Sequence, residues 1–167
     1  MSEVAEDTLL ATITQFLSEV EFDHPSPQSW ENEQGGQEFT VTAYKNLGNG
    51  LFKVHIQGDE QAQQVMFYCT WDIHVPPRKR QEVAELVARL NYDLCVGNFE
   101  FDFRDGEVRF KTTLVYEGIP LNFANLRAHF YTSIRMMNRS APWVESVIIS
   151  EHTALEAADL AKQPVET

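Results

Sequence analysis

An alternation of apolar and polar residues between positions 65 and 75 constrains the fold of this chain more than any other feature. Every second position carries an apolar side chain: Val65, Phe67, Cys69, Trp71, Ile73 and Val75. Successive side chains of a strand point to opposite faces of a sheet, so the segment predicts a strand with one face on a core. The other face then carries Met66, Tyr68, Thr70, Asp72 and His74.

Two shorter segments with the same alternation precede this strand. Residues 39–44 and 52–56 both alternate, and the Asn49-Gly50 pair between them is typical of a hairpin turn. The three segments together predict a three-strand antiparallel meander with one face on the core. A two-strand hairpin is expected around Asp105-Gly106, with an inner face formed by Phe99, Phe101, Phe103, Val108, Phe110, Thr112, Leu114 and Tyr116.

Helical spacing of apolar residues marks the remaining elements, in the segments 9–20, 83–90 and 123–148. Asp7 and Asn122 are candidate N-caps of the first and third helices. Pro142 is expected to interrupt or restart the third. The order is therefore helix, three-strand meander, helix, two-strand hairpin and C-terminal helix. This order predicts an α+β fold with sheet and helices in two layers.

The length of 167 residues suits one domain, which we expect to span residues 1–167. Residues 1–6 and 157–167 are expected to be frayed ends. Residues 21–37 form an acidic segment rich in proline and glycine, which predicts a loop with Trp30 standing among polar residues.

Charge narrows the choice of partner. The net charge is −12, and the region before Lys45 contains nine acidic residues and no Lys or Arg. Such a field repels nucleic acid and anionic membrane surfaces, so a basic or apolar polypeptide is the expected partner. The simpler interpretation is that the charge maintains solubility. Without a signal-peptide pattern or an apolar run near the ~18 residues of a membrane span, we expect a cytoplasmic protein.

The sequence offers no reactive constellation. Cys69 and Cys95 are expected to be buried free thiols. Cys69 and His74 are five residues apart on one predicted strand, so their side chains should lie on opposite faces. We therefore predict no catalytic residue, no metal and no cofactor. The four acids Glu100, Asp102, Asp105 and Glu107 could hold a hard cation, but pairing with the nearby bases is the favoured interpretation: Arg104, Arg109 and Lys111.

Four residues are candidates for contact with a partner. Trp30 and Trp143 stand outside the expected core, and each is either an anchor for a partner or a lid on its own core. Met66 and Tyr68 lie on the outward face of the clearest strand. Methionine adapts to a binding surface but also fills cores, so both roles stay open for Met66.

Three segments resemble the YbjN-type family, whose members are labelled candidate sensory transduction regulators of bacteria. They are residues 83–92, 96–102 and 105–110, and the resemblance extends over about residues 5–155. It implies a fold similar to type III secretion chaperones and a non-enzymatic binding module, commonly a dimer. It supplies no catalytic residues. The chain departs from the family in the loop at 21–37 and in the tail.

These observations lead to three hypotheses about function. The leading one is a non-enzymatic protein-binding module of chaperone-like or regulatory character, which receives an apolar segment at a sheet edge or helix groove. The alternative is a regulator that responds to a small molecule or a divalent cation, with the four acids of the hairpin as the cation site. The third is an enzyme whose site is assembled from distant elements.

Overall fold

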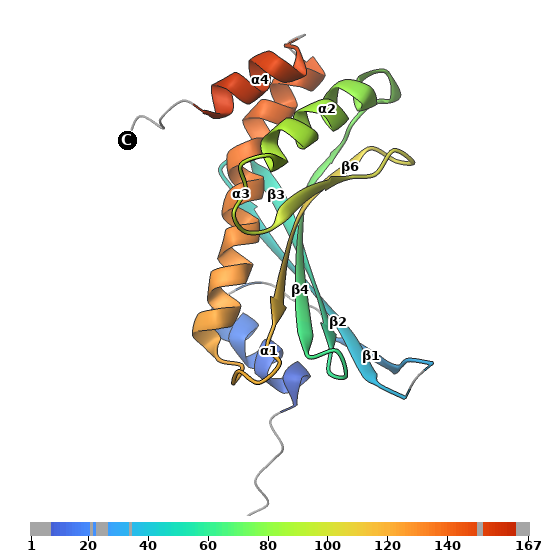
Figure 1. Cartoon of the computed structure of the whole chain (residues 1–167), viewed down its shortest axis with the longest axis vertical. Coiled ribbons are helices and arrows are strands. Elements are labelled where there is room, and N and C mark those ends of the chain that lie inside the picture. The colour runs from blue at the N-terminus through green and yellow to red at the C-terminus, as the bar shows by residue number, and fades with distance from the viewer. Residues whose placement is uncertain (1–7, 21, 23–26, 34, 150–151, 163–167) are drawn as a thin grey trace, which may run out of the picture.

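A six-stranded antiparallel sheet forms one layer of the molecule and the helices form the other (Figure 1). The computed structural model describes residues 8–20, 22, 27–33, 35–149 and 152–162. The strands are β1 (Gln28–Glu31), β2 (Gln37–Leu47), β3 (Gly50–Asp59), β4 (Gln64–His74), β5 (Asn98–Phe101) and β6 (Glu107–Val115). The helices are α1 (Leu9–Glu19), the short η1 (Pro77–Lys79), α2 (Arg80–Asn91), α3 (Phe123–Ile149) and α4 (Ala154–Ala161). The predicted two-layer α+β fold is confirmed.

The sheet has the strand order β1-β2-β3-β4-β6-β5, so the meander and the hairpin join into one sheet through β4 and β6. The alternation predicted for β4 holds, since Val65, Phe67 and Cys69 are fully buried. Ile73 is the exception, with an exposed fraction of 36%. The register between β4 and β6 shifts between Thr70 and His74, the stretch that contains Ile73, and an irregularity of this kind redirects side chains.

Two N-terminal predictions are wrong. Strand β1 lies within the segment expected to be a loop, and it places Trp30 opposite Glu38 of β2. All four β1 residues are exposed, so β1 has none of the apolar alternation by which a strand is recognised. At α1, the side chain of Thr8 caps the helix by accepting a hydrogen bond from the Ala11 N–H. Asp7, the expected cap, lies outside the described residues, as do residues 1–6.

The core lies between the inner face of the sheet and α3. Phe130 of α3 is fully buried and makes edge-to-face contacts with Phe16, Phe22 and Phe67, at ring centroid distances of 5.3, 4.8 and 6.3 Å. The expected cap of α3 is confirmed, because Asn122 accepts a hydrogen bond from the Asn125 N–H. In the part of the chain that the structure describes, no helix has the length and hydropathy to cross a membrane.

Helix α3 is continuous through Pro142, against the expectation that it would break there. Proline lacks the N–H that would donate to the carbonyl of residue 138 one turn earlier. The side chain of Asn49 in the β2–β3 turn supplies that hydrogen bond, from its Nδ2 to the Asn138 carbonyl oxygen at 2.8 Å. The Asn49 carbonyl in turn accepts a hydrogen bond from the Trp71 indole at 3.1 Å. The hairpin tip therefore compensates for the proline.

Helix α4 extends through Ala161, into the segment that we expected to be frayed. Thr153 and Glu156 form a capping box at the start of α4, and Ala154, Ala157 and Ala158 are buried. The Ala154 N–H also donates to Glu82 of α2 at 2.6 Å. Small side chains allow a close approach between α4 and α2, which hydropathy alone does not reveal. Residues 163–167 lie outside the described residues.

Replacing Asn49 with Ala should lower the free energy of unfolding by about 1–2 kcal/mol, because the Asn138 carbonyl loses its donor. In a Pro142→Ala background the helix regains its own N–H donor, so the same replacement should cost about 1 kcal/mol less. Urea unfolding of the four proteins measures both effects. Asn46→Ala is the matched control, since the Asn46 side chain is exposed and has no hydrogen bond within the described residues. Equal costs of Asn49→Ala in the two backgrounds would contradict this explanation.

Candidate functional site

The side of the sheet opposite to the helices, here called the outer face, carries three of the four residues expected to contact a partner. Cross-strand partners share a face, and the register aligns Thr42, His55, Tyr68 and Lys111 across β2, β3, β4 and β6. Met66 lies two residues from Tyr68 and therefore on the same face. Trp30 lies on this face because it is the cross-strand partner of Glu38, and 40% of its surface is exposed.

Tyr68 is the centre of a group of connected side chains, here called the Tyr68 cluster. The guanidinium of Arg109 lies over the Tyr68 ring, 4.6 Å from its centroid. The Tyr68 hydroxyl donates to the Met66 sulfur at 3.2 Å, and the His55 ring centroid is 6.3 Å from that of Tyr68. His55 Nδ1 and the Thr42 hydroxyl are 3.2 Å apart, within hydrogen-bond distance. The cluster thus connects four strands.

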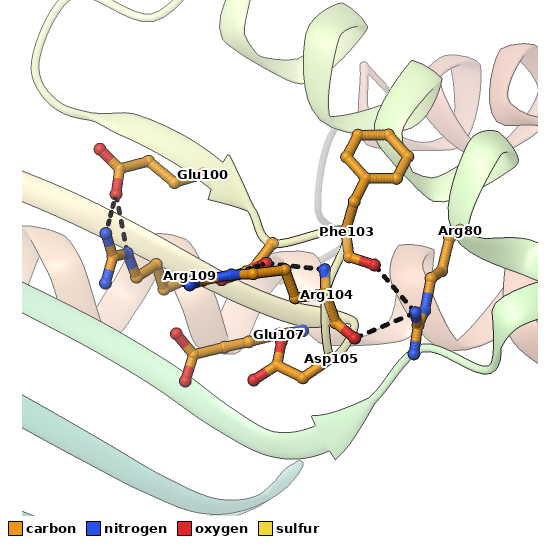
Figure 2. A network of polar contacts seen from close by, with 8 residues as sticks. Arg80, Glu100, Phe103, Arg104, Asp105, Glu107 and Arg109 are labelled. Carbon is orange, nitrogen blue, oxygen red and sulfur yellow. Dashed lines mark hydrogen bonds and ion pairs between the residues drawn. The ribbon is translucent and has the colours of Figure 1, made fainter.

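Glu100 of β5 holds the cationic side of the cluster. One carboxylate oxygen lies 2.7 Å from Arg109 (Figure 2). The other lies 2.7 Å from Lys111. Partial burial opposes ionisation of Glu100, but hydrogen bonds from Lys111 and Arg109 outweigh it and lower the pKa of the carboxyl. The predicted pairing of hairpin acids with nearby bases is confirmed for Glu100 and Asp102, but not for Asp105 and Glu107, which make no ion pair within the described residues. An Arg held over a Tyr and fixed by a carboxylate is a rigid donor surface.

The remaining hairpin acids are engaged separately. Asp102 pairs with Arg104 at 2.6 Å, and hydrogen bonds from Arg104 lower the pKa of Asp102 to about 2. Asp105 accepts a hydrogen bond from the Glu107 N–H, and both lie apart from Glu100 in Figure 2. Across the described ranges, no three His, Cys, Asp or Glu side chains are grouped as metal ligands would be.

Arg80, the first residue of α2, is bound to backbone carbonyls outside its own helix. Its guanidinium donates to the Phe103 carbonyl at 2.8 Å (Figure 2). Through Nε it also donates to the Val75 carbonyl at 3.2 Å. These contacts attach the β5–β6 turn to the start of the helix layer. Phe103, expected on the inner face, is 54% exposed because β5 ends at Phe101.

The two cysteines differ from each other. Cys69 is fully buried, and burial raises the pKa of its thiol, so the nucleophilic thiolate is disfavoured. Cys95 is exposed, against the expectation that both would be buried. Cys95 lies in the segment between α2 and β5. The apolar residues beside it in the sequence suggested burial, but they do not cover it. His74 is exposed on β4 and points to the opposite face from Cys69.

Trp143, the fourth expected partner residue, lies on the helix side in a cavity of about 540 Å³ among α2, α3 and α4. We call this cavity the helix groove, and its apolar lining includes Leu90, Leu94, Phe99, Met136, Trp143 and Leu155. The structure therefore separates the four residues into two surfaces. Arg109 and Arg139 complete these surfaces, and neither was among the residues predicted to contact a partner. The spacing of Arg139 and Trp143, four residues apart on a helix, is the signal that could have indicated the second pair.

Acid should destabilise the protein partly through His55. Burial and the charges of Lys53 and Arg109 lower the pKa of His55 below 6.5. The unfolded chain then binds more protons than the folded chain below pH 6.5, so this contribution reduces stability as the pH falls through that window. His55→Gln should therefore lose less stability than the wild type between about pH 7.5 and about pH 5.5. Urea midpoints at both pH values test this.

His129→Gln is the comparison variant, because burial also lowers the pKa of His129, a residue that does not lie on the outer face. An unchanged pH dependence in His55→Gln would contradict the assignment.

Comparison with known proteins adds a family. Comparison with curated proteins and with solved structures finds no match. The likeness to type III secretion chaperones therefore stays a prediction. The model of the YbjN family, described as "Putative bacterial sensory transduction regulator", matches residues 5–146. This match includes every strand and most of α3, and it ends before α4, somewhat earlier than the resemblance read from the sequence. Because the match covers most of its length, the chain belongs to the YbjN family.

Proposed function

We propose that this protein is a non-enzymatic binding module of regulatory or chaperone-like character, and that its outer face receives a polypeptide partner. The observation that carries the proposal is the Tyr68 cluster. It combines a tyrosine, an arginine and a methionine at the centre of a sheet face on which no described helix packs. The outer face offers such a partner a broad, rigid surface.

The composition of the outer face supports binding to protein. Interfaces are enriched in Tyr, Trp, Met and Arg, and the residues that contribute most binding energy cluster near their centre. Tyr68 and Arg109 hold the central position, while Trp30 and Tyr44, each 40% exposed, lie farther out on β1 and β2. Thr42 and the other threonines of this face supply polar contacts without long flexible chains.

The state of the ionisable groups supports a non-enzymatic role. The Glu100 carboxylate is occupied by two cations, and the Cys69 thiol is buried with a raised pKa. General acid–base or nucleophilic catalysis needs a group that is free to exchange a proton or attack a substrate. The same pairing weakens the alternative of a cation-responsive regulator, because a cation at Glu100 would have to displace Arg109 and Lys111.

The partner surface can be mapped by photo-crosslinking in bacterial lysate from single positions of the full-length protein. Tyr44 and Lys53 are exposed on the outer face, and Arg135 is the matched control on α3. A photoreactive residue at either outer-face position should capture the same polypeptide, and one at Arg135 should not. A band at the mass of two chains would identify the partner as a second copy, the homodimer that the family resemblance implies.

Within the captured complex, Tyr68→Ala should weaken binding by about 2 kcal/mol, or roughly 30-fold, because it removes the ring under Arg109. The purified partner titrated against wild type, Tyr68→Ala and Tyr92→Ala measures this. Tyr92 is a suitable control because it is 87% exposed and lies at the C-terminal end of α2, as its C-cap, rather than on the sheet. Capture from Arg135 equal to that from Tyr44 and Lys53, or equal affinity of all three proteins, would refute the proposal.

A further inference from the structure

The helix groove is a second surface with a different chemistry from the outer face. It lies where α4 packs against both α2 and α3, and its volume of about 540 Å³ falls in the range of roughly 300–1,000 Å³ that is typical of small-molecule sites. Its floor is apolar, and the Trp143 ring is half-buried within it. Such a cavity selects a ligand through the few polar groups at its rim.

The rim contains three cations, and one differs from the others in its pairing. Arg89 is bound to Glu85 at 2.6 Å, and Lys162 is bound to Asp159 at 3.0 Å. Arg139 makes no ion pair with any acid of the described residues, including Asp93, the other acid of the lining.

The contacts of Arg139 orient it without neutralising it. Its guanidinium lies 5.5 Å from the centroid of the Trp143 ring and donates to the Ala161 carbonyl at 3.4 Å. A guanidinium has five N–H donors, so most of its capacity is left for a ligand. Stacking on the indole limits the conformations of the side chain, which reduces the entropy lost when it binds an anion.

We propose that the helix groove binds a small amphipathic monocarboxylate, with its apolar chain against the floor and its carboxylate on Arg139. A carboxylate matches the planar fork of a guanidinium and can accept two parallel hydrogen bonds from it. The apolar lining of Leu90, Met136 and Leu155 accommodates an alkyl or aromatic chain. One carboxylate is the appropriate charge, because Arg139 is the one cation of the lining that makes no ion pair within the described residues, whereas Arg89 and Lys162 are each neutralised by an acid.

This ligand would give the protein a means of sensing a small molecule that is separate from the outer face. Helices α2, α3 and α4 supply most of the groove lining, and α4 contributes Leu155, Ala158 and Ala161 to its wall. Occupancy therefore stabilises the packing of α4 on α2 and α3, since a ligand that binds the folded state raises its stability.

Decanoate, 1-decanol and decyltrimethylammonium, each titrated below its aggregation concentration, test the proposal. Decanoate should raise the melting temperature of the full chain and change its tryptophan fluorescence, while the neutral and cationic analogues should bind at least about tenfold more weakly. Arg139→Gln should reduce decanoate affinity by about tenfold or more while leaving 1-decanol binding unchanged. Arg135→Gln, an exposed arginine one turn earlier on α3 and outside the groove lining, should bind decanoate like the wild type.

Equal binding of decanoate and 1-decanol, equal loss in Arg139→Gln and Arg135→Gln, or no binding of decanoate would each overturn the proposal. A photoreactive residue at Leu155 that captures a polypeptide not displaced by decanoate would also overturn it, because the groove would then be a protein site. The result is independent of the outer face: crosslinking from Tyr44 and Lys53 should be the same in Arg139→Gln as in the wild type.

Discussion

The packing of Phe130 against the sheet is the contact on which the rest of the structure depends. Its ring meets Phe67 of β4, Phe16 of α1 and Phe22 of the following segment, so one side chain joins the sheet to two parts of the helix layer. Burial of large aromatic side chains is among the strongest stabilising contributions in a domain of this size. Because this burial is confined to one face, the other face of the sheet is left for polar and aromatic side chains.

That one-sided burial explains why the two candidate surfaces differ. On the outer face, side chains stabilise one another through lateral contacts: Tyr68 with Arg109, and Arg109 with Glu100. Those contacts outweigh the cost of partly burying Glu100 and hold the side chains in a rigid surface. In the helix groove, a cavity remains among three helices, and the exposed Arg139 lies at its rim with its guanidinium over the Trp143 indole. A broad rigid face suits a macromolecule, and a small apolar cavity suits a small ligand.

The candidate sites were predictable only in part. Alternation placed Met66 and Tyr68 together on the outward face, because period two follows from strand geometry alone. It could not place Arg109 beside Tyr68, because that contact depends on β6 pairing with β4 rather than with another strand. Trp30 and Trp143 looked alike in sequence as aromatic residues outside the core. They lie on different sides of the molecule, since one belongs to an edge strand and the other to a helix.

Sequence by itself determined the order of most elements and the two-layer arrangement, because hydrophobic periodicity reports which face of each segment avoids water. Tertiary structure alone decided the features that depend on contacts between distant residues. Asn49 donates a hydrogen bond to the carbonyl of Asn138, 89 positions away, in place of the N–H that Pro142 lacks. Helix α3 therefore stays continuous where local rules predict a break. Strand β1, whose residues are all exposed, forms by pairing with the edge of β2. Helix α4 is held in place by its buried alanines and by the hydrogen bond from the Ala154 N–H to Glu82. Contacts of this kind cannot be recognised from the sequence around either residue, because that local sequence is compatible with several different contact partners.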